Sequence, residues 1–119
     1  MDTLYDSRGY ACAYVDADGR SIYLNDGSAV GWIDQVDVYA YGGRYLGWIQ
    51  EGWFFDRFGN RAFFTDATKG GPVKPARAAR PPRKDRAVRG ARGTREEKPA
   101  RPACALSWAP SSGAEYFKQ

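Results

Sequence analysis

Four copies of one short motif between residues 4 and 65 constrain the possible fold more than any other feature of this sequence. Each copy has an aromatic anchor, a glycine four residues later and a second ring nine residues after the anchor. The anchors, spaced by 18, 16 and 16 residues, are Tyr5, Tyr23, Tyr39 and Phe55. The glycines are Gly9, Gly27, Gly43 and Gly59, and the second rings are Tyr14, Trp32, Trp48 and Phe64. This spacing marks an internal structural repeat.

Each copy predicts a β-hairpin, because two runs rich in β-branched and aromatic residues flank a glycine-containing turn. Glycine comes last in turns such as Asn25-Asp26-Gly27, which favours a type I turn closed by a left-handed residue and a G1 bulge. A period of two predicts that the residues seven and nine positions after the anchor share one face. These pairs are Cys12/Tyr14, Val30/Trp32, Leu46/Trp48 and Ala62/Phe64. The position between them is small in Ala13, Gly31 and Gly47, which indicates that a ring or backbone approaches closely there.

A single hairpin is marginally stable in water, whereas four can bury their aromatic faces against one another. We therefore predict an all-β fold in which residues 1–69 form a four-fold flower, a propeller-like ring whose closure protects the strand edges. A flat meander and an open solenoid are the alternatives.

Residues 70–103 form an Arg/Pro-rich arm with eleven basic and three acidic residues, against six basic and ten acidic residues in 1–69. With few large apolar side chains, the arm is expected to be extended or disordered. Three interpretations stay open: a solvated linker, an arm that lies back on the acidic head, or a segment that binds nucleic acid or another polyanion. The candidate polyanion-binding residues are Lys74, Arg77, Arg80, Arg83, Lys84, Arg86, Arg89, Arg92 and Arg95. An acidic partner would be bound through residues 74–101, without base-specific recognition.

Residues 104–119 regain aromatic side chains, so we expect this C-terminal segment to dock on the flower. Ser111 or Ser112 is the expected cap of a last short helical turn. A peptide motif for a partner is the alternative. The N-terminus lacks the features of a signal peptide and no apolar run is long enough to cross a membrane, so we expect a cytoplasmic protein without a membrane partner.

The chemistry-bearing residues favour no catalytic, metal or cofactor site. The chain has no histidine, and its aspartates mostly occupy turns. Cys12 aligns with apolar residues in the other copies and is expected to be a buried, inert thiol, while Cys104 has no visible activating base. We therefore expect no enzymatic activity. Trp32 and Trp48 remain candidates for stacking on a sugar or quaternary amine, provided that their rings are exposed.

The chain resembles the four-fold beta-flower domain family. The matching segments are Tyr23/Gly27/Gly31-Trp32-Ile33, Tyr39/Gly43/Gly47-Trp48-Ile49, Gly70-Gly71-Pro72-Val73 and Leu106-Ser107-Trp108. Gly-Trp repeats also occur in choline-binding and MORN repeats, which are minor alternatives. The resemblance implies a fold and leaves the function open. The sequence as a whole predicts a non-enzymatic interaction or scaffold module, with polyanion binding through the arm and small-ligand binding by exposed Trp or Tyr rings as alternatives.

Overall fold

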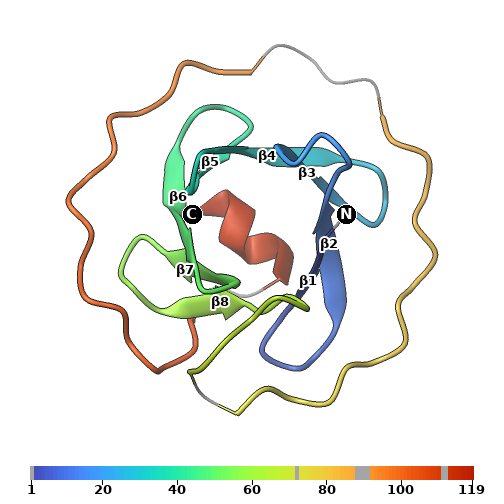
Figure 1. The fold of residues 1–119 in the computed structure, drawn as a ribbon. Helices are drawn as coiled ribbons and strands as arrows, with labels where there is room; N and C mark the ends of the chain where they lie inside the picture. The colour runs from blue at the N-terminus through green and yellow to red at the C-terminus, as the bar shows by residue number, and fades with distance from the viewer. Residues whose placement is uncertain (1, 72, 88–91, 111–112) are drawn as a thin grey trace.

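A computed structural model describes residues 2–71, 73–87, 92–110 and 113–119. Eight antiparallel strands pair in chain order. They are β1 (Thr3–Tyr5), β2 (Ala11–Val15), β3 (Ser21–Leu24), β4 (Ala29–Asp34), β5 (Asp37–Ala40), β6 (Tyr45–Gln50), β7 (Trp53–Asp56) and β8 (Arg61–Phe63). Tyr5 and Phe64 exchange two backbone hydrogen bonds of 2.9 Å, so the end of β8 meets β1 and the sheet closes into a small barrel (Figure 1). The predicted all-β, four-fold ring is confirmed.

The hairpin turns have the predicted geometry. In the second hairpin Gly27 has φ of +92° and its N–H donates to Leu24 O at 3.0 Å. Leu24 N–H in turn donates to Ser28 O at 2.9 Å, which completes a type I turn with a G1 bulge. The four hairpin tips, which we call petals, point outward from the barrel (Figure 1).

The predicted face of the second strands is wrong in part, because each hairpin contains a register shift. In the first hairpin Leu4 pairs with Ala13 and Tyr5 with Ala11, so Cys12 is an extra residue between them. A bulged residue breaks the period of two. As a result, the positions seven and eight residues after the anchor both face the barrel interior, as Ala62 and Phe63 do, while the ring at position nine lies outside.

The barrel interior is filled by aliphatic residues of the strands, by Phe54 and Phe63, and by the C-terminal 3-10 helix η1 (Gly113–Lys118), which lies on the barrel axis (Figure 1). Tyr116 is fully buried and donates a hydrogen bond from its hydroxyl to Phe55 O at 2.8 Å. Phe117 comes so close to Gly31 that a Cβ on this glycine would lie 3.5 Å from the Phe117 ring. Gly31 therefore faces this helix, whereas a Cβ on Gly47 would lie 1.8 Å from the backbone oxygen of Phe55 on β7. Ser111 and Ser112, the predicted caps, lie outside the described residues.

The aromatic residues of the repeat lie on the outer surface of the barrel, stacked in pairs between neighbouring hairpins. In each pair an anchor on one hairpin faces the second ring of the preceding hairpin directly across the strands, with centroids 4.7–5.8 Å apart. The four ring pairs are Tyr5–Phe64, Tyr14–Tyr23, Trp32–Tyr39 and Trp48–Phe55. They join each hairpin to the next around the whole ring.

The Arg/Pro-rich arm encircles the barrel. We call residues 73–87 and 92–105 the belt; this segment has no helix or strand and runs around the outside of the petals (Figure 1). Beyond it, Trp108 forms a parallel bridge with Arg61 and packs edge-on against Trp53 at 5.5 Å, after which the chain enters the barrel as η1. Neither a free linker nor a free tail describes these residues.

Candidate functional site

The belt is attached to every petal by the same pair of contacts. Its backbone N–H groups donate to the four turn glycines at 2.7–3.0 Å: Ala78 to Gly9 O, Ala87 to Gly27 O, Glu96 to Gly43 O and Ala105 to Gly59 O. A belt carbonyl also covers the Cα of each glycine, such as Asp85 O over Gly27, where a Cβ would lie 2.0 Å away. The belt residues recur every nine positions, so each petal binds one nonapeptide of the belt.

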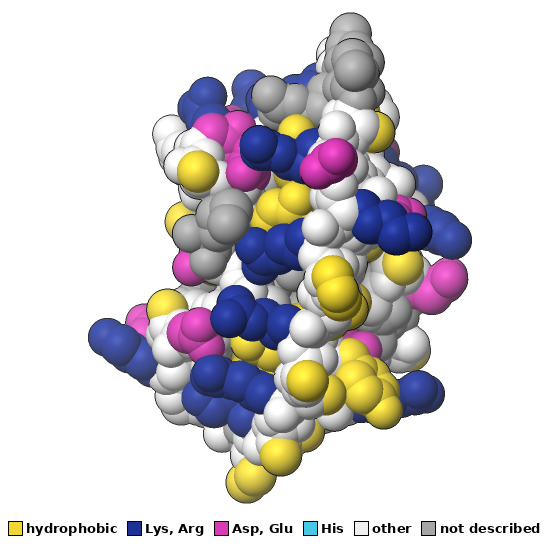
Figure 2. Space-filling model, turned by 90° about the vertical axis from the view of Figure 1, so that its right-hand side faces the viewer, with side chains coloured by type: hydrophobic (Ala, Val, Ile, Leu, Met, Phe, Trp, Pro, Cys, Tyr) yellow, Lys and Arg dark blue, Asp and Glu magenta, His cyan; other side chains and the backbone are white. Residues whose placement is uncertain are grey.

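Belt arginines cover the ring pairs. Six guanidinium groups lie 4.0–5.8 Å from ring centroids: Arg77 over Tyr5, Arg83 over Tyr14, Arg86 over Tyr23, Arg92 over Trp32, Arg95 over Tyr39 and Arg101 over Trp48. Cation–π contacts contribute about 0.5–1 kcal/mol each at exposed sites and more when desolvated. Figure 2 shows Lys and Arg side chains in successive rows beside the belt, alternating with hydrophobic and acidic groups. These contacts offset the entropy lost when the arm is ordered.

Four of these arginines also pair with carboxylates, and three of the carboxylates lie at or just beyond the C-terminal end of a strand. Arg77 pairs with Asp66 at 2.5 Å, Arg86 pairs with Asp16, and Arg95 pairs with Asp34. These three carboxylates occupy the same place in the repeat, two residues after the second ring. Each of their three arginine partners keeps about half of its side-chain surface exposed (45–52%). The row of charges is thus fixed in position yet open on its outer side.

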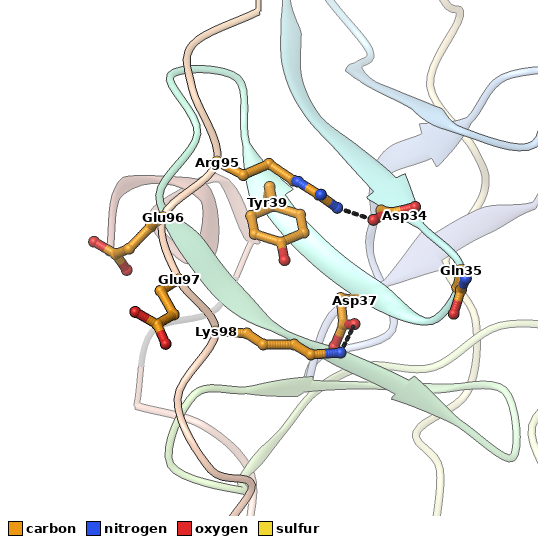
Figure 3. Close-up of a pocket in the computed structure, with 8 residues that line it drawn as sticks. All are labelled: Asp34, Gln35, Asp37, Tyr39, Arg95, Glu96, Glu97 and Lys98. Carbon is orange, nitrogen blue, oxygen red and sulfur yellow. Dashed lines mark hydrogen bonds and ion pairs between the residues drawn. The ribbon is translucent and has the colours of Figure 1, made fainter.

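The third quarter of the ring holds an additional buried carboxylate. Asp37, whose side chain is 7% exposed, accepts hydrogen bonds from Lys98 at 3.0 Å and Arg101 at 3.1 Å. Burial alone would raise the pKa of Asp37, but the hydrogen bonds and positive charges of Lys98 and Arg101 outweigh it and lower the pKa. Figure 3 shows Arg95 and Lys98 reaching from the belt toward Asp34 and Asp37, with Tyr39 between them. A polar cavity of about 360 Å³ lies here, lined in addition by Gln35, Glu96 and Glu97.

The first quarter has two cations at the equivalent belt positions, and the hydroxyl of Thr3 stands where the third quarter has the Asp37 carboxylate. Arg80 and Arg83 stand 18 residues before Lys98 and Arg101, two nonapeptides earlier. Both donate to the hydroxyl of Thr3, at 3.3 and 3.0 Å. Thr3, like Asp37, stands two residues before its ring anchor and pairs across the sheet with a second ring.

The fourth quarter departs from the pattern on both sides of the interface. Cys104 replaces the arginine of the nonapeptide and lies 3.5 Å from Gln50, which replaces the carboxylate. The missing cation comes from the barrel, since the Arg61 guanidinium lies 4.9 Å from the Phe55 centroid and 4.6 Å from that of Trp53. Arg61 also donates to Ala105 O at 3.1 Å, which holds the belt here.

Eight of the nine predicted polyanion-binding residues lie on the belt, and six of these eight already contact the barrel: Arg77, Arg80, Arg83, Arg86, Arg92 and Arg95. Lys74 and Lys84 are exposed, and Arg89 lies outside the described residues. The prediction missed Lys98 and Arg101 as site residues, and it missed their acidic partners. The signal that could have found them is the nine-residue period of the arm, in which Arg77, Arg86 and Arg95 recur.

The exposed rings that small-ligand stacking requires are not found at Trp32 and Trp48. These rings are buried, 7% and 1% exposed, and the cations above them are Arg92 and Arg101 of the same chain. The ring faces that could bind an external cation are thus occupied by belt arginines, whose spacing places one above each of these rings.

The described residues offer little for metal or thiol chemistry. Among them, no three His, Cys, Asp or Glu side chains gather where they could hold a metal ion. Burial, with a smaller effect from Asp6, raises the pKa of the Cys12 thiol to about 12, whereas Cys104 is exposed. In the part of the chain that the structure describes, no helix has the length and apolar character needed to cross a membrane.

Comparison with known proteins assigns the fold a family. Searches among curated proteins and among solved structures give no match. A family model described as 4-fold beta flower protein matches residues 2–117, and this range takes in the barrel, the belt and most of η1. The chain therefore belongs to the 4-fold beta flower family.

Proposed function

We propose that this protein is a non-enzymatic interaction module that binds an acidic partner through its belt. The observation that carries the proposal is the fixed row of half-exposed cations around the barrel. The belt side chains that pair with carboxylates keep 41–59% of their surface exposed: Arg77, Arg86, Arg95, Lys98 and Arg101.

Preorganisation supports this proposal. A free arginine-rich tail must lose conformational entropy when it binds, whereas the belt is already ordered on the ring pairs. A guanidinium that rests on a ring with one face still has N–H donors for a carboxylate or phosphate on its outer side. The belt also carries Lys74 and Lys84 at the surface, so its positive charge exceeds what the barrel carboxylates neutralise.

The roles of the repeat residues support the proposal that the module is non-enzymatic. The aromatic residues of the repeat stack on one another and under arginines, and the turn glycines hold the belt. The thiol of Cys12 is buried in a position that favours its protonated form. The residues that define the repeat thus serve folding, and the belt cations that pair with carboxylates keep about half of their side-chain surface open to solvent.

The test is binding of two labelled acidic polymers, a single-stranded oligonucleotide and polyglutamate, followed by fluorescence anisotropy at about 50 and 200 mM salt. Deleting the arm is unsuitable, because the arm is part of the fold. A Lys74→Gln/Lys84→Gln variant removes two exposed belt charges, and Arg20→Gln/Lys118→Gln removes two exposed charges outside the belt.

We expect the wild type to bind at least one polymer at low salt, with affinity falling at least tenfold at the higher salt. The belt variant should bind several-fold more weakly and the control variant should match the wild type. Absence of binding to both polymers at low salt, or equal losses in the two variants, would overturn the proposal.

A further inference from the structure

We infer that Arg80, Arg83 and Thr3 form a binding site for an external oxyanion, such as a phosphate or carboxylate group. This inference locates one contact of the acidic partner and in that sense rests on the proposed function. It comes from comparing two quarters of the same molecule, one of which contains its own anion.

The third quarter shows what the site holds when it is filled. The Asp37 carboxylate places one oxygen 3.0 Å from Lys98 Nζ and the other 3.1 Å from Arg101 Nη2. Arg101 also lies over the Trp48 ring, which is directly opposite Asp37 on the neighbouring strand. One carboxylate thus accepts from two cations that are already held by the belt.

The first quarter repeats this geometry around a neutral group. Arg80 Nη1 and Arg83 Nη2 lie 3.3 and 3.0 Å from a single acceptor, the Thr3 hydroxyl oxygen. Arg83 lies 4.0 Å from the centroid of Tyr14, the ring opposite Thr3. The two quarters are equivalent in strand position, ring and nonapeptide register. They differ in the first cation, Arg80 in place of Lys98, and in the charge of the acceptor.

Electrostatics favour an anion at this place. Two guanidiniums that converge on one hydroxyl repel each other, and an oxyanion beside them would accept from both. Thr3 is buried, 3% exposed, whereas Arg80 is exposed and Arg83 partly exposed, so the open side of the site is formed by the cations. Both donors meet at a neutral group, the Thr3 hydroxyl.

The chemical class follows from the donors. Guanidinium groups offer paired N–H donors that match the oxygens of phosphate, sulfate or carboxylate. The Asp37 carboxylate shows that a two-oxygen acceptor fits the equivalent pair. Phosphate and acetate used separately distinguish a phosphoryl source from a carboxylate source.

The test exchanges the two acceptors in the full-length protein. Thr3→Asp supplies the site with an internal carboxylate, and Asp37→Thr leaves Lys98 and Arg101 facing a hydroxyl. Inorganic phosphate or acetate is titrated at constant ionic strength, and the arginine Nε–Hε signals are followed by NMR. Circular dichroism and thermal unfolding check that each variant is folded.

In the wild type, the Arg80 and Arg83 signals should shift with saturation, while that of Arg20 should change linearly or not at all. Thr3→Asp should weaken the saturable response at least tenfold, and Asp37→Thr should create a second one on Arg101. A linear response of Arg80 in the wild type, or an undiminished response in folded Thr3→Asp, would overturn the site. Polymer binding without a phosphate or acetate response would reject this site and leave the proposed function standing. A saturable phosphate or acetate response without polymer binding would reject the proposed function alone.

Discussion

At the scale of single residues, the turn glycines meet two separate demands. Gly27 has a φ of +92°, a region that side chains rarely adopt, and its Cα lies directly beneath the carbonyl of Asp85. Gly19, in the connection between β2 and β3, has a φ of +71° but open space around its Cα. Both positions would strain the backbone of any other residue, but only at Gly27 would a side chain also collide with the belt.

Gly27→Ala should therefore destabilise the protein more than Gly19→Ala. A left-handed alanine costs about 1–2 kcal/mol at either position. At Gly27 the added methyl would also collide with Asp85 O, 2.0 Å away, and displace the belt from the second petal. Urea unfolding measures the difference, and limited trypsin digestion should cut the belt faster only in Gly27→Ala. Equal losses of stability in the two variants would show that the belt does not bear on this turn.

The ion pairs of Asp37 make the free energy of unfolding depend on pH in the acid range. Its pKa in the folded protein lies below the ordinary value, so its contribution is fully present above the unfolded pKa of about 3.9 and is lost as the pH falls through the folded pKa. Asp37→Asn should lower the melting temperature at pH 7 and narrow its gap to the wild type below about pH 4. Asp85→Asn, which removes an exposed belt carboxylate, is the control. A constant gap from neutral to acid pH would contradict the role given to Asp37.

At the scale of elements, the length of the belt matches the size of the ring. The molecule measures 36 Å in both long directions, and a circle of that diameter is about 110 Å around. Four nonapeptides of extended chain at about 3.1 Å per residue cover nearly the same length. The nine-residue period is therefore set by the distance between neighbouring petals.

A one-residue insertion in the belt should be more harmful than any neutral substitution there. An alanine inserted after Ala79 shifts the following arginines out of register with their rings, beginning with Arg83 above Tyr14. We expect a lower melting temperature and faster tryptic cleavage between Arg80 and Arg101. The same insertion after Gly19, where the chain is exposed, is the control. An insertion tolerated equally well at both places would mean that the belt has no fixed register.

The hairpins could be predicted from the sequence because rings and glycines recur in one strict register. The side of the sheet on which the rings lie could not, since the extra residue at Cys12 follows from no simple period. The belt was obscured by its own composition, because proline and arginine are typical of linkers. Its contacts depend on matching two different periods, 16 to 18 residues in the barrel and nine in the arm, and each is visible only when the other is known.

The candidate site was predictable to the same extent. The belt residues Arg80 and Arg83 were identified from charge alone, but Thr3 carries no sign of a site until it is superposed on Asp37. That comparison requires the pairing of strands and belt, which the sequence does not contain. Trp32 and Trp48 show the converse, since a pattern that favours ligand stacking is satisfied by arginines some 50 to 60 residues later.

At the scale of the whole molecule, a barrel is filled from the inside by η1 and held from the outside by the belt. The Cα radius of gyration is 13.3 Å, close to the roughly 13.5 Å expected for a compact chain of this length. Small-angle scattering should give a compact particle within about 2 Å of that value. A clearly larger radius with a flexible scattering profile would show that the belt is released in solution.

Tyr116 should be the side chain of η1 on which this closure depends most. Tyr116→Phe removes the hydrogen bond to Phe55 O and should cost about 1–2 kcal/mol. Tyr116→Ala also leaves a cavity beside Phe63 and should cost about 3–5 kcal/mol. Lys118→Ala, on the exposed side, should stay within about 0.5 kcal/mol of the wild type. Denaturant unfolding ranks the three, and similar losses in all of them would contradict the buried position of η1.

The path of the belt also has a consequence for biosynthesis. The chain leaves the ribosome from its N-terminus, so all four hairpins are made before Arg77, Arg86 and Arg95 emerge to cover their rings. During that interval the nascent barrel presents a circle of bare aromatic pairs and an empty axis. Pausing or truncation after the fourth hairpin would then leave an aggregation-prone intermediate with exposed aromatic surface, of the kind that chaperones bind. The belt and η1, which are synthesised after the hairpins, cover these two apolar surfaces.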